Sequence, residues 1–177
     1  MHNWEDKTMH AMRRKDRQIT DLEAIRAILD GEDVLHLAMC DENTPYVVPM
    51  SYGYELSEDG KLILYLHCAS EGRKLEMLRK NPNVCFEVSR KIKLVYNEKM
   101  GSCTAKYRSV IGSGKAILEE SAEEKLRSLD ALMKQAGHAE HPPYEEKLLA
   151  ITRTLRIEAD EYTAKSTLLP GEEGYPA

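Results

Sequence analysis

One segment constrains the fold of this chain more than any other: residues 62–88, LILYLHCASEGRKLEMLRKNPNVCFEV. Its first part, residues 62–67, is a compact apolar run with the composition of a buried strand. A short helix with an apolar side follows, and Asn81-Pro82 ends it because the residue before a proline avoids the helical region. Residues 84–88 resume as a strand. The segment therefore predicts a strand–turn–helix–turn–strand unit.

The turn inside this unit, SEGRK, places Ser70, Gly72, Arg73 and Lys74 at the start of the predicted helix. Ser70 is a good candidate for the N-cap. Free backbone N–H groups and the positive end of the helix dipole both favour an anion here, so the turn is a candidate phosphate site. The same residues also fit an ordinary capped helix with two solvated cations. The turn alone leaves both interpretations open.

The other segments are mostly strands joined by hairpin-like turns. Strands are predicted over residues 34–40, 46–56, 104–118 and 154–163, and helices at the capping boxes 20–23 and 121–124. Pro49 cannot donate to a sheet ladder, so its strand is bulged or at an edge. Gly112 and Gly114 suggest a bulge or curvature, as a barrel wall requires. We expect a mainly β fold with peripheral α-helices, built as a small antiparallel, Greek-key-like barrel.

The length of 177 residues suits one domain. We expect a flexible N-terminal segment over residues 1–18, the barrel domain over 19–168, and a flexible C-terminal tail over 169–177. A doubly wound parallel sheet needs regular alternation of strands and helices, which this chain lacks. The glycine-rich turns of dinucleotide and P-loop sites are absent as well.

Composition excludes several classes of function. The formal net charge of -5 gives no support to a nucleic-acid partner. No apolar run approaches the ~20 residues of a membrane helix, and the N-terminus lacks the apolar region of a signal peptide, so we expect a cytoplasmic chain without a membrane partner. The four cysteines form no CxxC pair and are expected to be reduced. No metal site is predicted.

Five stretches taken together resemble a known family. They are RRKDRQITD (13–21), PYVVPMSYGYE (45–55), LHCASEGRKLEMLRKNPNVCFEV (66–88), YRSVIGSGKA (107–116) and EEKLRSLDALM (123–133). Their order and spacing are similar to those of the nitroimidazole-resistance (Nim-type) flavoproteins of the pyridoxamine 5'-phosphate oxidase-like superfamily. The resemblance implies an FMN-binding split β-barrel that forms a homodimer with FMN at the subunit interface.

The resemblance also implies which residues bind the cofactor. The expected FMN phosphate ligands are Ser70, Gly72, Arg73 and Lys74; the isoalloxazine ring runs along Val48, Pro49, Met50 and Ser51; and Tyr107, Arg108, Ser109 and Val110 approach from a neighbouring strand. His67 matches a histidine that family members place close to the flavin.

Two functions remain open at this point. In the first, NAD(P)H reduces FMN and the reduced flavin passes electrons to a nitroaromatic or other small oxidised acceptor. His67 then either donates a proton or only hydrogen-bonds the cofactor or the barrel wall. In the second, the protein is a non-catalytic module that stores or senses a flavin or another planar cofactor. A true pyridoxamine-phosphate oxidase is not expected, because the phosphate of its substrate needs a second basic cluster and the sequence shows none.

Overall fold

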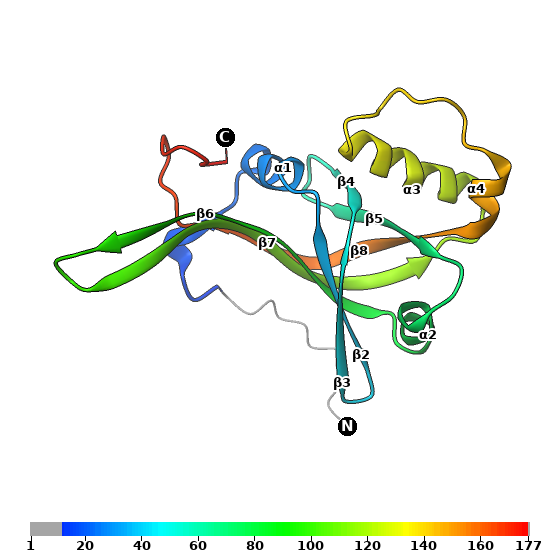
Figure 1. The fold of residues 1–177 in the computed structure, drawn as a ribbon, viewed down its shortest axis with the longest axis horizontal. Helices are drawn as coiled ribbons and strands as arrows, with labels where there is room; N and C mark the ends of the chain where they lie inside the picture. The colour runs from blue at the N-terminus through cyan, green and yellow to red at the C-terminus, as the bar shows by residue number, and fades with distance from the viewer. Residues whose placement is uncertain (1–11, 177) are drawn as a thin grey trace.

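The computed structural model describes residues 12–176 (Figure 1). The strands are β1 (Gln18–Ile19), β2 (Leu35–Asp41), β3 (Thr44–Met50), β4 (Tyr52–Leu56), β5 (Leu62–Ala69), β6 (Asn83–Asn97), β7 (Ser102–Leu118) and β8 (Thr152–Ser166). The helices are the 3-10 helix η1 (Lys15–Arg17), α1 (Leu22–Asp30), α2 (Arg73–Lys80), α3 (Ala122–Gln135) and α4 (Glu146–Ile151).

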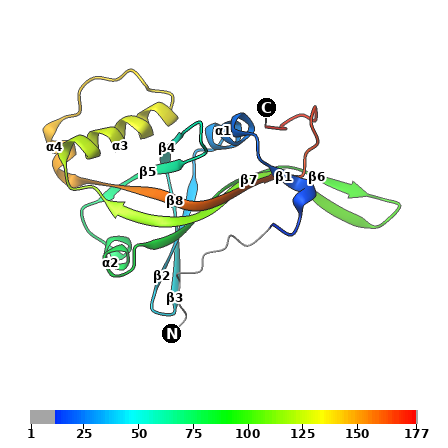
Figure 2. The same cartoon turned by 180° about the vertical axis from the view of Figure 1, so that it is seen from behind.

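In this part of the chain all the strands belong to one antiparallel sheet with the order β3-β2-β6-β7-β8-β5-β4, and β1 pairs with β8. This arrangement confirms the predicted mainly β split barrel with peripheral helices. The hairpin of β6 and β7 runs out beyond the body of the sheet (Figures 1 and 2). The register of β7 against β8 shifts between Ser113 and Gly114, which confirms the predicted bulge.

The prediction of one continuous strand over residues 46–56 is wrong. The chain forms β3 up to Met50, leaves the ladder at Ser51 and resumes as β4, and the two strands lie at opposite edges of the sheet. The change of partner explains the break, because Met50 pairs with Leu35 whereas Tyr52 pairs with Leu66. Pro49 is tolerated since β3 pairs with β2 alone among the described strands, so the predicted edge position is confirmed.

The core lies between the curled sheet and α1. Asp21 caps the first turn of α1 by accepting a hydrogen bond from the Glu23 N–H, and Gly31 follows its last residue. The fully buried side chains come from α1 and five strands: Ile28, Leu29, Leu35, Leu37, Leu62, Leu64, Leu66, Phe86, Val88, Val110, Leu155 and Ile157. Each contributes about 1.5–3 kcal/mol by leaving water, so this cluster holds the two halves of the sheet together.

Helix α3 packs closely on β4 and fixes the edge of the sheet opposite β3. Ser121 caps the helix by accepting a hydrogen bond from the Glu124 N–H at 3.1 Å, as its capping box predicts. A Cβ atom at Gly53 would collide with the backbone of Ala131, so only glycine allows this approach.

The predicted terminal segments fall partly outside the described residues. Residues 1–11 are not described, and residues 15–17 form η1 just before β1 pairs with β8. At the other end the backbone N–H of Leu169 bonds Glu172, whose carboxylate pairs with Lys106 at 2.9 Å. The domain boundaries and the flexibility of the tail stay predictions. In the described part of the chain no helix is long and apolar enough to cross a membrane.

Candidate functional site

The start of α2 is the centre of the candidate site. Gly72, not Ser70, occupies the N-cap position, with φ at +125°, a backbone conformation that side chains other than hydrogen rarely allow. Ser70 is exposed in the preceding turn. Among the described residues no side chain caps this helix. The Leu75 N–H bonds the Gly72 carbonyl at 3.0 Å, which leaves the backbone N–H groups of Arg73 and Lys74 for another acceptor. The prediction of Ser70 as the N-cap is therefore wrong, and the anion site at this turn stays a prediction.

The two cations of this turn rest on uncharged groups of β3. The Arg73 guanidinium carbon lies 4.5 Å from the centre of the Tyr46 ring. The Lys74 ammonium lies 3.3 Å from the sulfur of Met50. Within residues 12–176 neither cation forms an ion pair with a carboxylate, so both positive charges remain uncompensated.

These contacts bring two of the predicted groups together. Met50 is buried at 8% exposure, Val48 is half-buried, and Pro49 and Ser51 are exposed along and just after β3. Because side chains alternate along a strand, Val48 shares a face with Tyr46 and Met50, and those two contact α2. The strand predicted to face the flavin ring thus lies beside the turn predicted to hold the phosphate.

His67 lies near the end of β5, has an exposed side chain and is influenced by the charge of Lys74. It pairs with Thr154 of β8, and the next residue, Cys68, pairs with Arg153. Partial burial and, secondarily, the charge of Lys74 lower the pKa of His67 from its ordinary value. Burial raises the pKa of the Cys68 thiol, although Lys74 and Arg153 act in the opposite direction.

Two residues of this cluster were not predicted from the sequence. Tyr46 belongs to the β3 stretch that was singled out, and the period-two spacing to Val48 could have found it. Arg153 carries no local signal, because only the pairing of β5 with β8 brings it beside Cys68.

The third predicted group, residues 107–110 of β7, does not join this cluster within one chain. Arg108 pairs with Glu32 at 3.0 Å, and both side chains are only 12% exposed. Glu32 follows α1, which lies well apart from α2 in both views (Figures 1 and 2). Val110 is fully buried in the core, so its side chain is occupied by packing.

The remaining two residues of that group have unusual surroundings. Ser109 is 4% exposed, and its hydroxyl has no hydrogen-bond partner among the described residues. Burial alone raises the pKa of the Tyr107 phenol, but hydrogen bonds and charges from Arg17 and Lys165 outweigh burial and lower that pKa. Lys165 also lies 5.4 Å from the centre of the Tyr107 ring.

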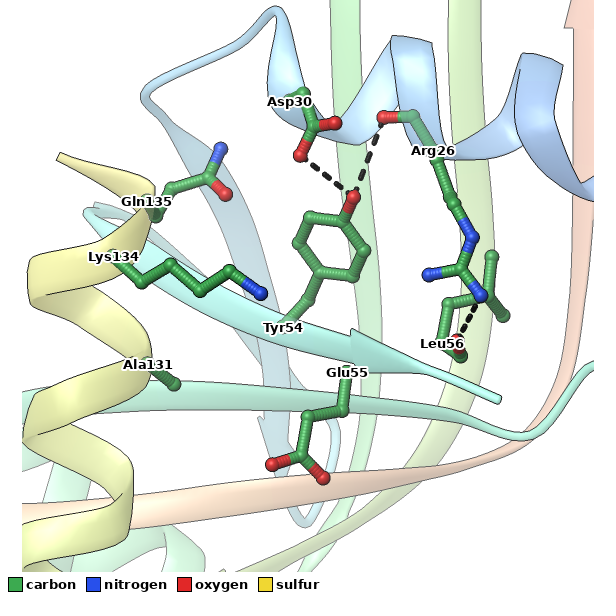
Figure 3. Close-up of a pocket in the computed structure, with 8 residues that line it drawn as sticks. All are labelled: Arg26, Asp30, Tyr54, Glu55, Leu56, Ala131, Lys134 and Gln135. Carbon is green, nitrogen blue, oxygen red and sulfur yellow. Dashed lines mark hydrogen bonds between the residues drawn. The ribbon is translucent and has the colours of Figure 1, made fainter. Parts of the chain in front are cut away.

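A separate polar pocket of about 420 Å³ lies between α1, β4 and α3 (Figure 3). None of the predicted site residues lines this pocket. Its lining consists of Arg26, Asp30, Tyr54, Glu55, Leu56, Ala131, Lys134 and Gln135. Several of its polar groups bond one another. The Tyr54 hydroxyl donates to Asp30 at 2.7 Å, and Arg26 donates to the Leu56 carbonyl. Burial, and secondarily the hydrogen bond to Asp30, raise the pKa of Tyr54 well above its usual range.

The curled antiparallel sheet with its peripheral helices defines the class: a split-barrel protein. The chain belongs to the pyridoxamine 5'-phosphate oxidase family, whose model matches residues 21–166. A search of curated proteins gave no match.

Three solved structures illustrate the similarity. A protein of Bacteroides thetaiotaomicron VPI-5482, named as a candidate 5-nitroimidazole antibiotic resistance protein, is 33% identical with a TM-score of 0.72, covering 84% of this chain and 86% of that chain. The flavocytochrome Anf3 of Azotobacter vinelandii is 25% identical with a TM-score of 0.71, covering 91% and 74%. An FAD and heme binding protein of Mycobacterium smegmatis is 22% identical with a TM-score of 0.73, covering 91% and 76%, and shares the fold. The predicted family resemblance is confirmed.

Proposed function

We propose that this protein is an FMN-dependent flavoprotein that passes electrons from NAD(P)H to a nitroaromatic or other small oxidised acceptor. One observation carries the proposal: Arg73 and Lys74 keep uncompensated charges at an uncapped helix start, in a chain whose net charge is -5. An acidic protein whose described residues leave two neighbouring cations without carboxylate partners is suited to bind a compact anion there.

The residues present fit the parts of FMN. The backbone N–H groups that follow Gly72 and the hydroxyl of Ser70 can donate hydrogen bonds to its phosphate. Arg73 can add a fork of donors, and Lys74 a point charge. Its ring calls for a partly apolar surface, which β3 offers from Val48 to Ser51. Bound flavin supplies the redox chemistry, whereas the chain orients the reactants and excludes water.

His67 is the proposed proton donor. Because burial, and secondarily Lys74, lower the pKa of His67, the neutral imidazole is favoured and the donating form gains population as the pH falls. If His67 donates the proton, acceptor reduction rises as the pH falls through this range. If it only hydrogen-bonds the cofactor, flavin affinity carries the pH dependence instead.

Two relatives support the proposal, one for the flavin and the other for the class of acceptor. One solved structure at 25% identity is named a flavocytochrome, and one at 33% identity is named for nitroimidazole resistance. We transfer the flavin from the first and the class of acceptor from the second. The choice of FMN over FAD rests on the compact anion site at Arg73 and Lys74.

We also propose a homodimer with FMN at the subunit interface, which lets residues 107–110 of a second copy approach the flavin. Exposed apolar side chains on the β6–β7 hairpin support a partner surface, with Leu94 at 61%, Tyr96 at 64% and Met100 at 75% exposure. Obligate dimer interfaces bury about 2,000 Å² or more. Sedimentation at micromolar concentration should give the dimer mass, and a monomer would contradict the shared site.

The absorbance spectrum of the purified protein with added FMN tests the proposal, followed by anaerobic NADPH or NADH and then a nitroaromatic acceptor. We expect bound flavin that bleaches with the nicotinamide and recovers with the acceptor. Bound flavin that never bleaches would support the non-catalytic storage or sensing module instead. Absence of binding would overturn the flavoprotein proposal.

A further inference from the structure

The contact between Arg73 and Tyr46 joins two elements that are not otherwise linked in sequence. Tyr46 lies on β3 at the edge of the sheet, half-buried against the core, and Arg73 is the first residue of α2. The guanidinium carbon lies over the ring, 4.5 Å from its centre. This distance is well within the ~6 Å at which a cation and an aromatic face attract.

An aromatic partner leaves the hydrogen-bonding capacity of an arginine free. A guanidinium presents its five N–H donors in its plane, whereas the attraction to a ring acts between the charge and the π-electrons. Arg73 therefore gains a fixed position without giving its donors to a carboxylate. An exposed arginine without such a contact samples many rotamers, and a ligand that binds it must order the whole side chain.

Arg127 shows the alternative outcome in the same chain. Its guanidinium carbon lies 6.0 Å from the centre of the Tyr65 ring, but two of its nitrogens donate to the Glu55 carboxylate at 3.2 and 2.6 Å. The fork that could grip a phosphate is occupied there. The two arginines differ because Arg127 pairs with Glu55, whereas no carboxylate within residues 12–176 pairs with Arg73.

We propose that Tyr46 is a positioning residue that presents Arg73 to the phosphate of FMN. In consequence, Tyr46 sets how strongly the site prefers a phosphorylated flavin to riboflavin. This inference rests on the proposed function. It adds a residue that acts through Arg73 and touches neither the phosphate nor the redox-active ring.

A double-mutant cycle tests the inference with two ligands. FMN and riboflavin are titrated by flavin fluorescence into the parent protein, Tyr46→Leu, Tyr46→Phe, Arg73→Ala and the double variant Tyr46→Leu/Arg73→Ala. We expect Tyr46→Leu to weaken FMN about two- to fivefold, the scale of an exposed cation–π contact, and to leave riboflavin unchanged. Tyr46→Phe keeps the ring and should bind FMN like the parent. In the Arg73→Ala background Tyr46→Leu should have no further effect.

Several outcomes overturn the inference. Equal loss of both ligands in Tyr46→Leu means that Tyr46 contacts the flavin ring or supports β3. A loss in Tyr46→Phe as large as that in Tyr46→Leu means that the hydroxyl acts. Additive losses in the double variant mean that Tyr46 does not act through Arg73.

A measurement without flavin separates this inference from the proposed function. In the NMR spectrum of the free protein the Arg73 side-chain protons should carry a ring-current shift that disappears in Tyr46→Leu and persists in Tyr46→Phe. No such shift overturns the positioning role even if FMN binds. A shift without any FMN binding by the parent protein overturns the proposed function, and the inference falls with it.

Discussion

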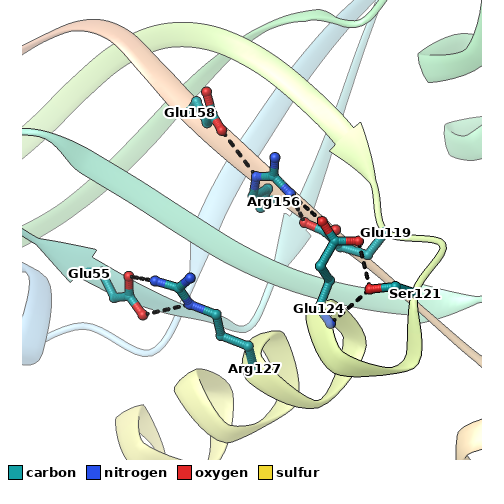
Figure 4. Close-up of polar contacts among 7 residues, drawn as sticks. All are labelled: Glu55, Glu119, Ser121, Glu124, Arg127, Arg156 and Glu158. Atoms are coloured by element: carbon teal, nitrogen blue, oxygen red, sulfur yellow. Dashed lines mark hydrogen bonds and ion pairs between the residues drawn. The ribbon is translucent and has the colours of Figure 1, made fainter.

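Two basic regions of this molecule treat their positive charges in opposite ways. Along β8 and α3, Arg156 donates to Glu119 at 2.6 Å and to Glu158 at 3.1 Å, and Arg127 grips Glu55 (Figure 4). At the start of α2, Arg73 rests on an aromatic ring and Lys74 on a thioether. Along β8 and α3 the cations are paired with carboxylates, whereas at the start of α2 they contact only uncharged groups among the described residues.

The comparison separates structural cations from cations that can bind a ligand. Glu119 is 2% exposed at its side chain, and burial is the largest cause of its raised pKa, with Arg156 acting in the opposite direction. The carboxylate therefore needs its guanidinium in order to be buried in the charged form. The charges of Arg73 and Lys74 satisfy no buried group, so the fold gains little from them. Their arrangement is explained better by a ligand than by stability.

The largest expected effect falls on the structural region. Arg156→Ala should reduce the free energy of unfolding by about 3–5 kcal/mol, because it leaves the buried carboxylate of Glu119 without its cationic partner. Arg73→Ala should change the same quantity by less than about 0.5 kcal/mol, as at an ordinary surface position. Urea unfolding followed by circular dichroism measures both. Similar losses in the two variants would remove the distinction between the regions.

The pH dependence sharpens this prediction. A raised pKa in the folded state means that Glu119 favours folding most below its unfolded value of about 4.5, and that this contribution is lost as the pH rises. Removing Arg156 raises the pKa of Glu119 further. The loss of unfolding free energy in Arg156→Ala should therefore be larger at pH 7 than near pH 4.5. A deficit that does not depend on pH would indicate lost packing.

A second effect concerns the ligand-binding region. His67→Asn should lower acceptor reduction by about 100-fold if the imidazole donates a proton, the lower end of general acid catalysis, while FMN affinity holds. Steady-state kinetics at several pH values and a parallel FMN titration measure this. Weaker FMN binding with unchanged turnover of the saturated protein would make His67 a cofactor ligand. No change in either would dismiss it from the site.

The smallest effect tests the link between Lys74 and His67. Lys74→Gln should weaken FMN about two- to fivefold, the scale of a partly screened charge contact. It should also raise the pKa of His67, because Lys74 is the second cause of its lowering. The value should stay below that of a free histidine, since burial remains. An NMR titration of the imidazole gives the pKa, and an unchanged value would place Lys74 too far from His67.

The strand–turn–helix unit could be predicted from the sequence because its signals are local. Apolar spacing and Asn81-Pro82 define where β5, α2 and β6 lie. The N-cap was predicted two residues too early, since a φ of +125° at Gly72 selects glycine for backbone reasons that outweigh the hydroxyl of Ser70.

What the sequence could not reveal depends on long-range pairing. The break at Ser51 lies inside an apolar run, and only the switch from the β2 to the β5 partner divides it. Arg108 was predicted to approach the cofactor, but in the folded chain its guanidinium pairs with Glu32, which is distant in sequence. The stack of Arg73 on Tyr46 likewise requires α2 to fold back over β3.

The central claim is that Arg73 holds the phosphate of FMN, and a flavin-fluorescence titration of Arg73→Ala tests it most directly. Arg127→Ala serves as the matched control, since its guanidinium is already bound to Glu55. We predict that Arg73→Ala loses about 1.5–3 kcal/mol of FMN affinity, roughly ten- to hundredfold, with riboflavin unaffected and Arg127→Ala like the parent protein. Equal loss of FMN and riboflavin in Arg73→Ala, or no loss of either, would contradict the claim.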